Sequence, residues 1–272
     1  MDLLGPYELG RVYQGDCLEL MKAIPSGSVP MIWTDPPYGH NNNDGDLQNH
    51  RERALGRIPK NEEARPILCD SAEDMERVVR GMLAEAGRIL NKDCCCCCCC
   101  CGGGPTPTFS RVAQWMDEKP LQFFHAVVWD KGYLGLGWRY RRNYEFVMVA
   151  HRRSGKLLWK WDGCGMETAN VVRIQKIIAQ ANTHPTPKPV ALIEHFLRLH
   201  TKPGDIVLDP FAGSGPTGIA CAKMGRRFLG FELDQKWVDL ANDRIKAQAM
   251  GMGVDELRAG QTSLLDLIEE KE

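Results

Sequence analysis

A stretch near the C-terminus constrains the fold more than any other part of the chain. The apolar residues 205–209 run into the turn 210–215, whose Gly-x-Gly ending precedes a helical pattern over residues 216–224. A second apolar run, residues 227–231, ends in Glu232. A glycine turn lets backbone approach a ligand at a helix N-terminus, and an acid after the second strand can accept hydrogen bonds from ribose hydroxyls. The sequence therefore predicts an α/β fold with a mostly parallel sheet and ligands at the carboxyl ends of its strands.

The second informative stretch is a strand that stops abruptly. The apolar residues 29–33 lead into Asp35, Pro36, Pro37 and Tyr38. The two prolines fix φ and carry no N–H, so the strand cannot continue and a rigid corner results. The corner holds a carboxylate, a carbonyl and an aromatic face, which suit a flat base that bears an exocyclic amine. Taken alone, the four residues could also be a proline-terminated strand and turn without a ligand.

Together these two blocks carry a resemblance to a known family. Asp-Pro-Pro-Tyr near the N-terminus and Asp-Pro-Phe-Ala-Gly-Ser-Gly near the C-terminus resemble the S-adenosylmethionine-dependent amino DNA methyltransferases. The order, with the catalytic block first, is similar to that of the β group, which is common in bacteria and phages. Residues 15–18 and 184–189 fit two further family blocks, and the likeness spans residues 11–39 and 184–246 with a weaker match between.

The resemblance implies both a fold and an activity. The fold is a Rossmann-like class I methyltransferase with a mostly parallel seven-stranded sheet, a terminal antiparallel hairpin and a circularly permuted motif order. The activity is site-specific transfer of a methyl group from S-adenosylmethionine to the N6 amine of adenine in double-stranded DNA, after the base has been flipped out. Two alternatives stay open: methylation of cytosine N4, and a catalytically silent protein that only binds DNA or the cofactor.

Site residues are also implied by the resemblance. Asp35, Pro36, Pro37 and Tyr38 form the candidate catalytic block. Thr186 and Lys188 would line the cofactor or its entrance, or would belong to a purely structural loop, and Asp16 could be a helix N-cap as well as a contact to the adenine of the cofactor. The complete set of candidate cofactor-binding residues is Asp16, Cys17, Asp35, Thr186, Lys188, Asp209, Phe211, Gly213, Ser214, Gly215, Phe231 and Glu232.

A local basic region is the candidate DNA surface. Lysine and arginine are interleaved with tyrosine and tryptophan from Lys131 to Lys160, and cations close to aromatic rings are typical of nucleic-acid surfaces. The alternative is a solvated basic face with some of the rings in the core. The candidate DNA-binding residues are Arg139, Arg141, Arg142, Arg152, Arg153 and Lys156.

Composition sets outer limits on the function. The 34 basic and 35 acidic side chains nearly cancel, so only a local basic surface could bind DNA. No segment has the length of a membrane span and no signal pattern opens the chain, which predicts a cytoplasmic protein. Eight of the twelve cysteines form the run 94–101, which suits a buried central strand better than a zinc site, so no metal is expected.

The predicted organisation is a single catalytic domain over residues 1–250, followed by a C-terminal tail over residues 251–272. The polar residues 40–68 read as a mobile loop that could close over the cofactor or DNA. Residues 155–183 lie where the family builds target recognition. This segment is short, so a second subunit of a homodimer could share the task, and any restriction nuclease would be a separate protein.

Overall fold

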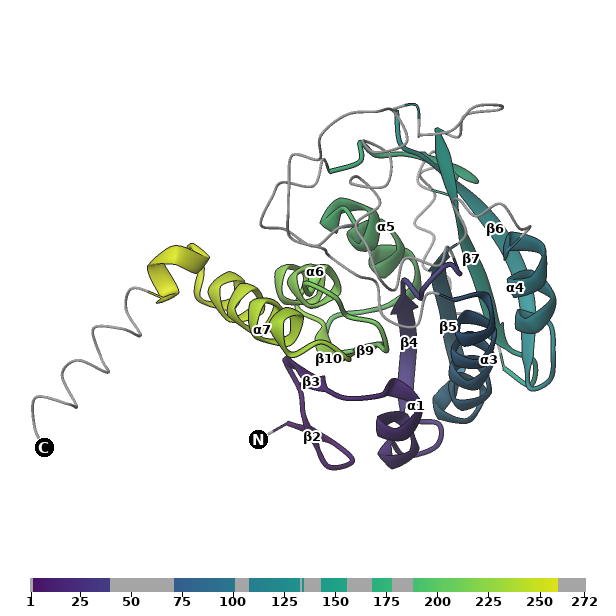
Figure 1. The fold of residues 1–272 in the computed structure, drawn as a ribbon, viewed down its shortest axis with the longest axis horizontal. Helices are drawn as coiled ribbons and strands as arrows, with labels where there is room; N and C mark the ends of the chain where they lie inside the picture. Colours follow the sequence, from purple (N-terminus) through teal and green to yellow (C-terminus); the bar gives the residue numbers. More distant parts are fainter. Residues whose placement is uncertain are drawn as a thin grey trace, which may run out of the picture.

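A single twisted sheet forms the centre of the molecule, with helices on both faces (Figure 1). The computed structural model describes residues 2–39, 71–100, 108–132, 134, 143–155, 168–177 and 188–258. Its strand order is β3-β10-β9-β4-β5-β7-β6-β8. The bounds of these strands in chain order are β3 (Arg11–Gln14), β4 (Val29–Thr34), β5 (Leu90–Cys100), β6 (Leu121–Asp130), β7 (Tyr144–Arg152), β8 (Val171–Arg173), β9 (Ile206–Asp209) and β10 (Arg227–Glu232).

The sheet confirms the α/β fold of a class I methyltransferase and adds one strand to the expected seven. Within this sheet, every neighbouring pair of strands is parallel except the two pairs that β7 forms with β5 and β6. The hairpin β6–β7 is therefore present, but it does not end the sheet, because β8 pairs with β6 in parallel. A separate two-stranded sheet joins β1 (Leu3–Leu4) to β2 (Tyr7–Glu8).

Two helical layers cover the sheet. One layer holds the short α1 (Cys17–Leu20), its 3-10 continuation η1 (Met21–Ala23), α3 (Ala72–Ile89) and α4 (Thr108–Met116); the other holds α5 (Val190–His200), α6 (Pro216–Met224) and α7 (Gln235–Met250) (Figure 1). Serine at position 71 caps α3, because its hydroxyl accepts the Asp74 amide at 3.0 Å. None of the helices in the described ranges is long and apolar enough to cross a membrane.

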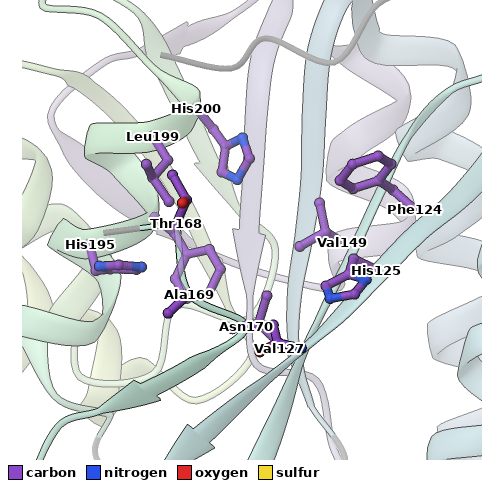
Figure 2. Close-up of a pocket in the computed structure, with 11 residues that line it drawn as sticks. Phe124, His125, Val127, Val149, Thr168, Ala169, Asn170, His195, Leu199 and His200 are labelled. Atoms are coloured by element: carbon purple, nitrogen blue, oxygen red, sulfur yellow. The ribbon is translucent and has the colours of Figure 1, made fainter. Parts of the chain in front are cut away.

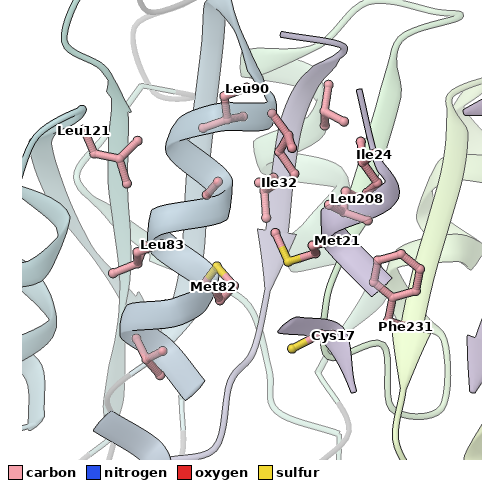
Figure 3. Packing of buried hydrophobic residues seen from close by; sticks show 14 of the residues in the cluster. Cys17, Met21, Ile24, Ile32, Met82, Leu83, Leu90, Leu121, Leu208 and Phe231 are labelled. Atoms are coloured by element: carbon pink, nitrogen blue, oxygen red, sulfur yellow. The ribbon is translucent and has the colours of Figure 1, made fainter. Parts of the chain in front are cut away.

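The side chains of β4 alternate between the two layers and so join two cores. Ile32 packs with Met21, Met82 and Phe231 in the first core (Figure 3), while Trp33 packs against Phe196 in the second. A strand that is buried on both faces must be apolar at successive positions, which is the pattern that the sequence shows. Because β4 is buried on both faces, its position is fixed, and so is that of residues 35–38, which follow it directly.

The cysteine run lies in a central strand, as expected. Strand β5 is paired on one side with β4 and on the other with β7, with Cys96 opposite both Ile32 and Ala150. The side chains of the run lie outside the described residues. Elsewhere in the part of the chain that the structure describes, no group of three or more His, Cys, Asp or Glu side chains could hold a metal ion.

Candidate active site

The corner after β4 and the glycine turn after β9 lie side by side. Strand β4 pairs in parallel with β9, with Ile32 opposite Leu208. Asp35 and Asp209 therefore stand at the same edge of the sheet, although 174 positions separate them in the sequence. Tyr38 and Phe211 are partly buried against the same core cluster. The two blocks thus meet at the carboxyl ends of neighbouring strands, where open α/β sheets bind their ligands.

Asp35 is held by two donors at the corner. The Tyr38 hydroxyl donates a hydrogen bond to Oδ1, and the Lys188 ammonium donates one to Oδ2 at 2.5 Å. Lys188 also donates to the Tyr38 oxygen at 2.9 Å. Burial raises the pKa of Asp35 above its ordinary value, although the positive charge of Lys188 opposes the shift. Lys188 therefore belongs to the corner that follows β4. Its expected place near the cofactor stays a prediction.

A buried group of charges lies behind this corner. Lys131 donates to Glu145 Oε1 at 3.0 Å, and Lys188 Nζ lies 3.7 Å from Glu145 Oε2. Burial alone would raise the pKa of Glu145, but Lys188 and Lys131 outweigh it and the pKa lies below its ordinary value. Burial lowers the pKa of the neighbouring Lys176. Lys131 is only 7% exposed, so its expected place on a basic surface is wrong: it is a buried partner of Glu145.

Sequence reasoning missed the role of Glu145. The signal was an acid inside the otherwise apolar run that became β7. A carboxylate in a buried strand requires a cationic partner. In β7 the side chain of Tyr144 is exposed, whereas that of Glu145 is only 9% exposed and lies on the buried face of the strand.

The glycine turn and Glu232 form one unit. Gly213 and Gly215 have φ values of 49° and 77°, which favour glycine, and Gly215 precedes the first turn of α6. The Gly213 amide donates to Glu232 Oε2 at 2.9 Å, while the amides of Leu233 and Asp234 donate to Oε1 at 2.9 and 3.0 Å. A carboxylate offers about four acceptor positions, so Glu232 can still accept from a ribose hydroxyl. Burial raises its pKa.

Asp209 and Ser214 brace the turn from within. Asp209 is 3% exposed and accepts from the Phe211 amide at 3.1 Å and from the Thr217 hydroxyl at 2.5 Å. Burial raises the pKa of Asp209 to about 7. Ser214 accepts from the Arg244 guanidinium on α7 through its carbonyl at 2.7 Å and its hydroxyl at 3.0 Å. These contacts tie β9 and the turn to helices α6 and α7.

Asp16 lies at the same edge of the sheet, one strand further on. Its side chain caps α1 by accepting the Leu18 amide at 2.9 Å, and the amide of the preceding Gly15 donates to the Glu232 carbonyl at 2.9 Å. The N-cap role is therefore confirmed, and it leaves Asp16 exposed beside Glu232. Two other residues of the expected cofactor set are placed differently, and their contact with the cofactor stays a prediction. The side chains of Cys17 (5% exposed) and Phe231 (0% exposed) lie inside the core, because apolar side chains are more stable away from water.

Comparison with known proteins decides the family. Residues 29–243 match the family model described as DNA methylase. The chain belongs to this N6/N4 DNA methylase family. The type II methyltransferase M.Cfr9I of Citrobacter freundii is 27% identical over 272 residues, which cover 89% of this chain and 90% of that protein.

Solved structures share the fold of this DNA methylase. The M1.HpyAVI–SAM complex has a TM-score of 0.63 at 23% identity and covers 86% of this chain and 98% of that one. The cytosine-N4-specific PvuII DNA methyltransferase has a TM-score of 0.62 at 17% identity and covers 91% of this chain and 95% of that one. As a member of its family, the methylase transfers methyl groups to DNA, and its cofactor is S-adenosylmethionine.

Two of the six residues expected to bind DNA lie in the described part of the methylase. Arg152 and Arg153 lie where β7 ends beside the start of β6, with Arg152 opposite Leu121. Arg152 donates to the Leu90 carbonyl at 3.2 Å, and Arg153 to the Asp117 carbonyl at 2.9 Å. This is the amino end of the parallel strands, opposite Asp35. The structure therefore places these two arginines away from Asp35, because β7 runs antiparallel to its neighbours. Their binding to the DNA substrate stays a prediction.

Several predicted features lie outside the described residues. These are Thr186, most of the 155–183 recognition segment, the 40–68 loop, and Arg139, Arg141, Arg142 and Lys156.

A separate pocket lies between α5 and the hairpin (Figure 2). Its wall combines His125 of β6 and Val149 of β7 with His195 and His200 of α5. Residues 168–170 close one side. The lining includes neither Asp35 nor the glycine turn, so this pocket is distinct from the candidate active site.

Proposed function

We propose that this DNA methylase modifies the N6 amine of adenine in double-stranded DNA. The observation that carries the proposal is the carboxylate of Asp35, held at the carboxyl edge of the sheet next to the glycine turn. The family to which the chain belongs leans to Asp at this position for adenine and to Ser for cytosine. The neighbouring Tyr38 and the carbonyl of Pro36 complete the catalytic group that we propose.

The corner suits an amine that is a poor nucleophile. The nitrogen lone pair of an exocyclic amine is delocalised into the base. Asp35 and the Pro36 carbonyl would accept hydrogen bonds from its two N–H groups. These bonds would draw the nitrogen toward tetrahedral geometry and expose the lone pair. Tyr38 would stack against the flipped base. Placed acceptors and a fixed approach would then accelerate the reaction without a covalent enzyme intermediate.

The residues around the turn fit the cofactor. S-adenosylmethionine, when bound, supplies a methyl group activated by a sulfonium. We propose that the turn around Gly213 and Gly215 receives its methionyl part, with Phe211 beside it. Glu232 would accept from the ribose, and the exposed Asp16 one strand away would meet the adenine. The bond between the Gly213 amide and Glu232 supports this assignment, because it holds both parts of the cradle in one piece.

A second candidate function is methylation of cytosine N4. It is favoured by the fold shared with the cytosine-N4-specific PvuII enzyme. Cytosine N4 is also an exocyclic amine, so the same acceptors could orient it.

One experiment separates these outcomes. The protein would be expressed in a host without adenine methylation, and the host DNA would be sequenced with detection of modified bases. We expect N6-methyladenine within one short sequence, and no modification from an Asp35→Ala variant expressed at the same level. N4-methylcytosine would refute the adenine assignment. Unmodified DNA from the folded wild type, together with cofactor binding, would favour the catalytically silent alternative.

We also propose that residues 1–250 form one catalytic domain. This is supported by the sheet, which draws its strands from Arg11 to Glu232 into a single layer. A homodimer that shares target recognition remains a prediction, and size-exclusion chromatography with light scattering would test it.

A further inference from the structure

We propose that Lys188 occupies the place of the target amine at Asp35 in the free enzyme and moves to Glu145 when the base enters. The inference rests on the proposed function, because it assigns a positioning role at the same corner. Lys188 would then act as an internal substitute for the substrate, which keeps the acceptors of the site aligned until DNA arrives.

The contacts of Lys188 imitate those expected of the substrate. Its ammonium donates to Asp35 at 2.5 Å and to the Tyr38 oxygen at 2.9 Å, and it lies 5.2 Å from the centre of the Tyr38 ring. A flipped base needs the same carboxylate for its amine and the same ring for stacking. The ammonium fills the position beside both the Asp35 carboxylate and the Tyr38 ring, and two groups cannot fill the same space, so it must withdraw before the amine can take that position.

Glu145 offers the position to which the ammonium can withdraw. Its Oε1 accepts from Lys131 at 3.0 Å, whereas its buried Oε2 accepts no hydrogen bond from the part of the chain that the structure describes. Buried carboxylate oxygens almost always have a donor, so an exception requires an explanation. Lys188 Nζ is 3.7 Å from Oε2, within the range of a salt bridge and slightly beyond a hydrogen bond. A small movement would complete the missing bond.

The surrounding charges permit this exchange. Two carboxylates, Asp35 and Glu145, face three ammonium groups, Lys131, Lys176 and Lys188, as buried or partly buried neighbours. Moving Lys188 from one carboxylate to the other keeps all the charges inside the cluster. Asp35 therefore keeps a cation nearby while its Oδ2 becomes accessible to the amine. Lys188 itself is only 7% exposed, so its contact is part of the built site and not a surface lysine folded inward.

The direct test is a structure of the wild type with a cognate duplex and a non-reactive cofactor analogue. We expect the base amine within hydrogen-bond reach of Asp35 and Lys188 Nζ within about 3.2 Å of Glu145 Oε2. The inference is overturned if Lys188 remains bonded to Asp35 while the flipped base is in place.

Kinetics of variants give an independent test. Lys188→Met should lower kcat at pH 7 at least tenfold and move the acid limb of the kcat/KM profile to higher pH, because Asp35 loses its nearest cation. The other groups that face Asp35 remain in place: Tyr38, Glu145, Lys176 and Asp209. Lys188→Arg should restore the position of the acid limb. Glu145→Gln should lower kcat/KM for DNA about tenfold and change the cofactor Kd less than twofold, because the displaced ammonium finds a weaker acceptor.

Controls separate this role from a structural one. Lys223→Met removes an ammonium paired with Glu194 at 3.5 Å on the far helices and should leave the profile unchanged. If the Lys188 variants bind cofactor and keep the wild-type pH profile, the inference fails while the proposed function stands. If the wild type methylates no DNA, both fail together.

Discussion

Replacing Asp209 by Asn tests the electrostatics of the site through stability. Asp209 is buried, and burial raises its pKa to about 7 while contacts to Thr217 and the Phe211 amide oppose the shift. In the unfolded chain the carboxyl would titrate near the ordinary value of about 3.9. Between these two pH values the folded protein holds a proton that the unfolded chain has lost. The contribution of this group to the free energy of unfolding is therefore at its maximum below about pH 4 and falls as the pH rises to about 7.

The size of the effect follows from the two pKa values. Each pH unit in this window changes the free energy of unfolding by about 1.4 kcal/mol, and the three units together by roughly 4 kcal/mol. Asn has nearly the same shape and cannot ionise, and the Thr217 hydroxyl can rotate to accept from its amide. The stability of Asp209→Asn relative to the wild type should therefore increase by about 2 to 3 kcal/mol between pH 5 and pH 7.

Urea unfolding followed by tryptophan fluorescence at pH 5, 6, 7 and 8 would measure this difference. Trp33 and Trp129 are each 1% exposed, so their emission reports loss of the core. Asp239→Asn makes the same chemical change at an exposed carboxyl on α7 and serves as the matched control. If Asp209→Asn shows a constant difference from pH 5 to pH 8, the raised pKa of Asp209 is refuted.

Three further variants address the site. Asp35→Ala should abolish methyl transfer and leave cofactor binding detectable by calorimetry; retained transfer would remove Asp35 from the mechanism. Gly213→Trp should abolish cofactor binding, and normal binding would show that the cofactor site is elsewhere. Gly215→Ala should destabilise the fold by roughly 1 to 3 kcal/mol, because φ is 77° and the new Cβ would lie 2.9 Å from Ala241. Gly225→Ala, with φ of 67° and open space, should cost less in thermal unfolding; equal losses would contradict the steric argument.

Local sequence patterns predicted the framework of the site because each depends on neighbouring residues. Prolines stop β4, glycines open α6, and the helical pattern over residues 216–224 is α6 with the same ends. The meeting of Asp35 with the glycine turn also followed, because parallel strands place their carboxyl ends at one edge. The resemblance to a family supplied the chemistry that these patterns alone left open.

The buried charges behind Asp35 could not be predicted in the same way. Lys188, Glu145 and Lys131 come from three separate segments, and their contact depends on which strands are neighbours and which faces their side chains take. A periodicity of two in β7 tells that Glu145 and Tyr144 point to opposite faces, but it does not tell which face is covered. Only the three-dimensional arrangement shows that a lysine expected on the surface neutralises an acid inside the protein.

The direction of β7 explains why basic residues that are close in sequence lie at opposite edges of the sheet. Lys131 and Glu145 lie near the catalytic edge, where β6 ends and β7 begins, whereas Arg152 lies at the opposite edge. The seven residue-to-residue steps from Glu145 to Arg152 span roughly 24 Å at about 3.4 Å per step. A cluster of charges that is continuous in sequence is thus divided between two ends of the sheet. Charge density along the chain therefore indicates a DNA surface only after the strand direction is known. In this methylase it separates the lysine that pairs with Glu145 from arginines that hold β7 to the start of β5 and the end of α4.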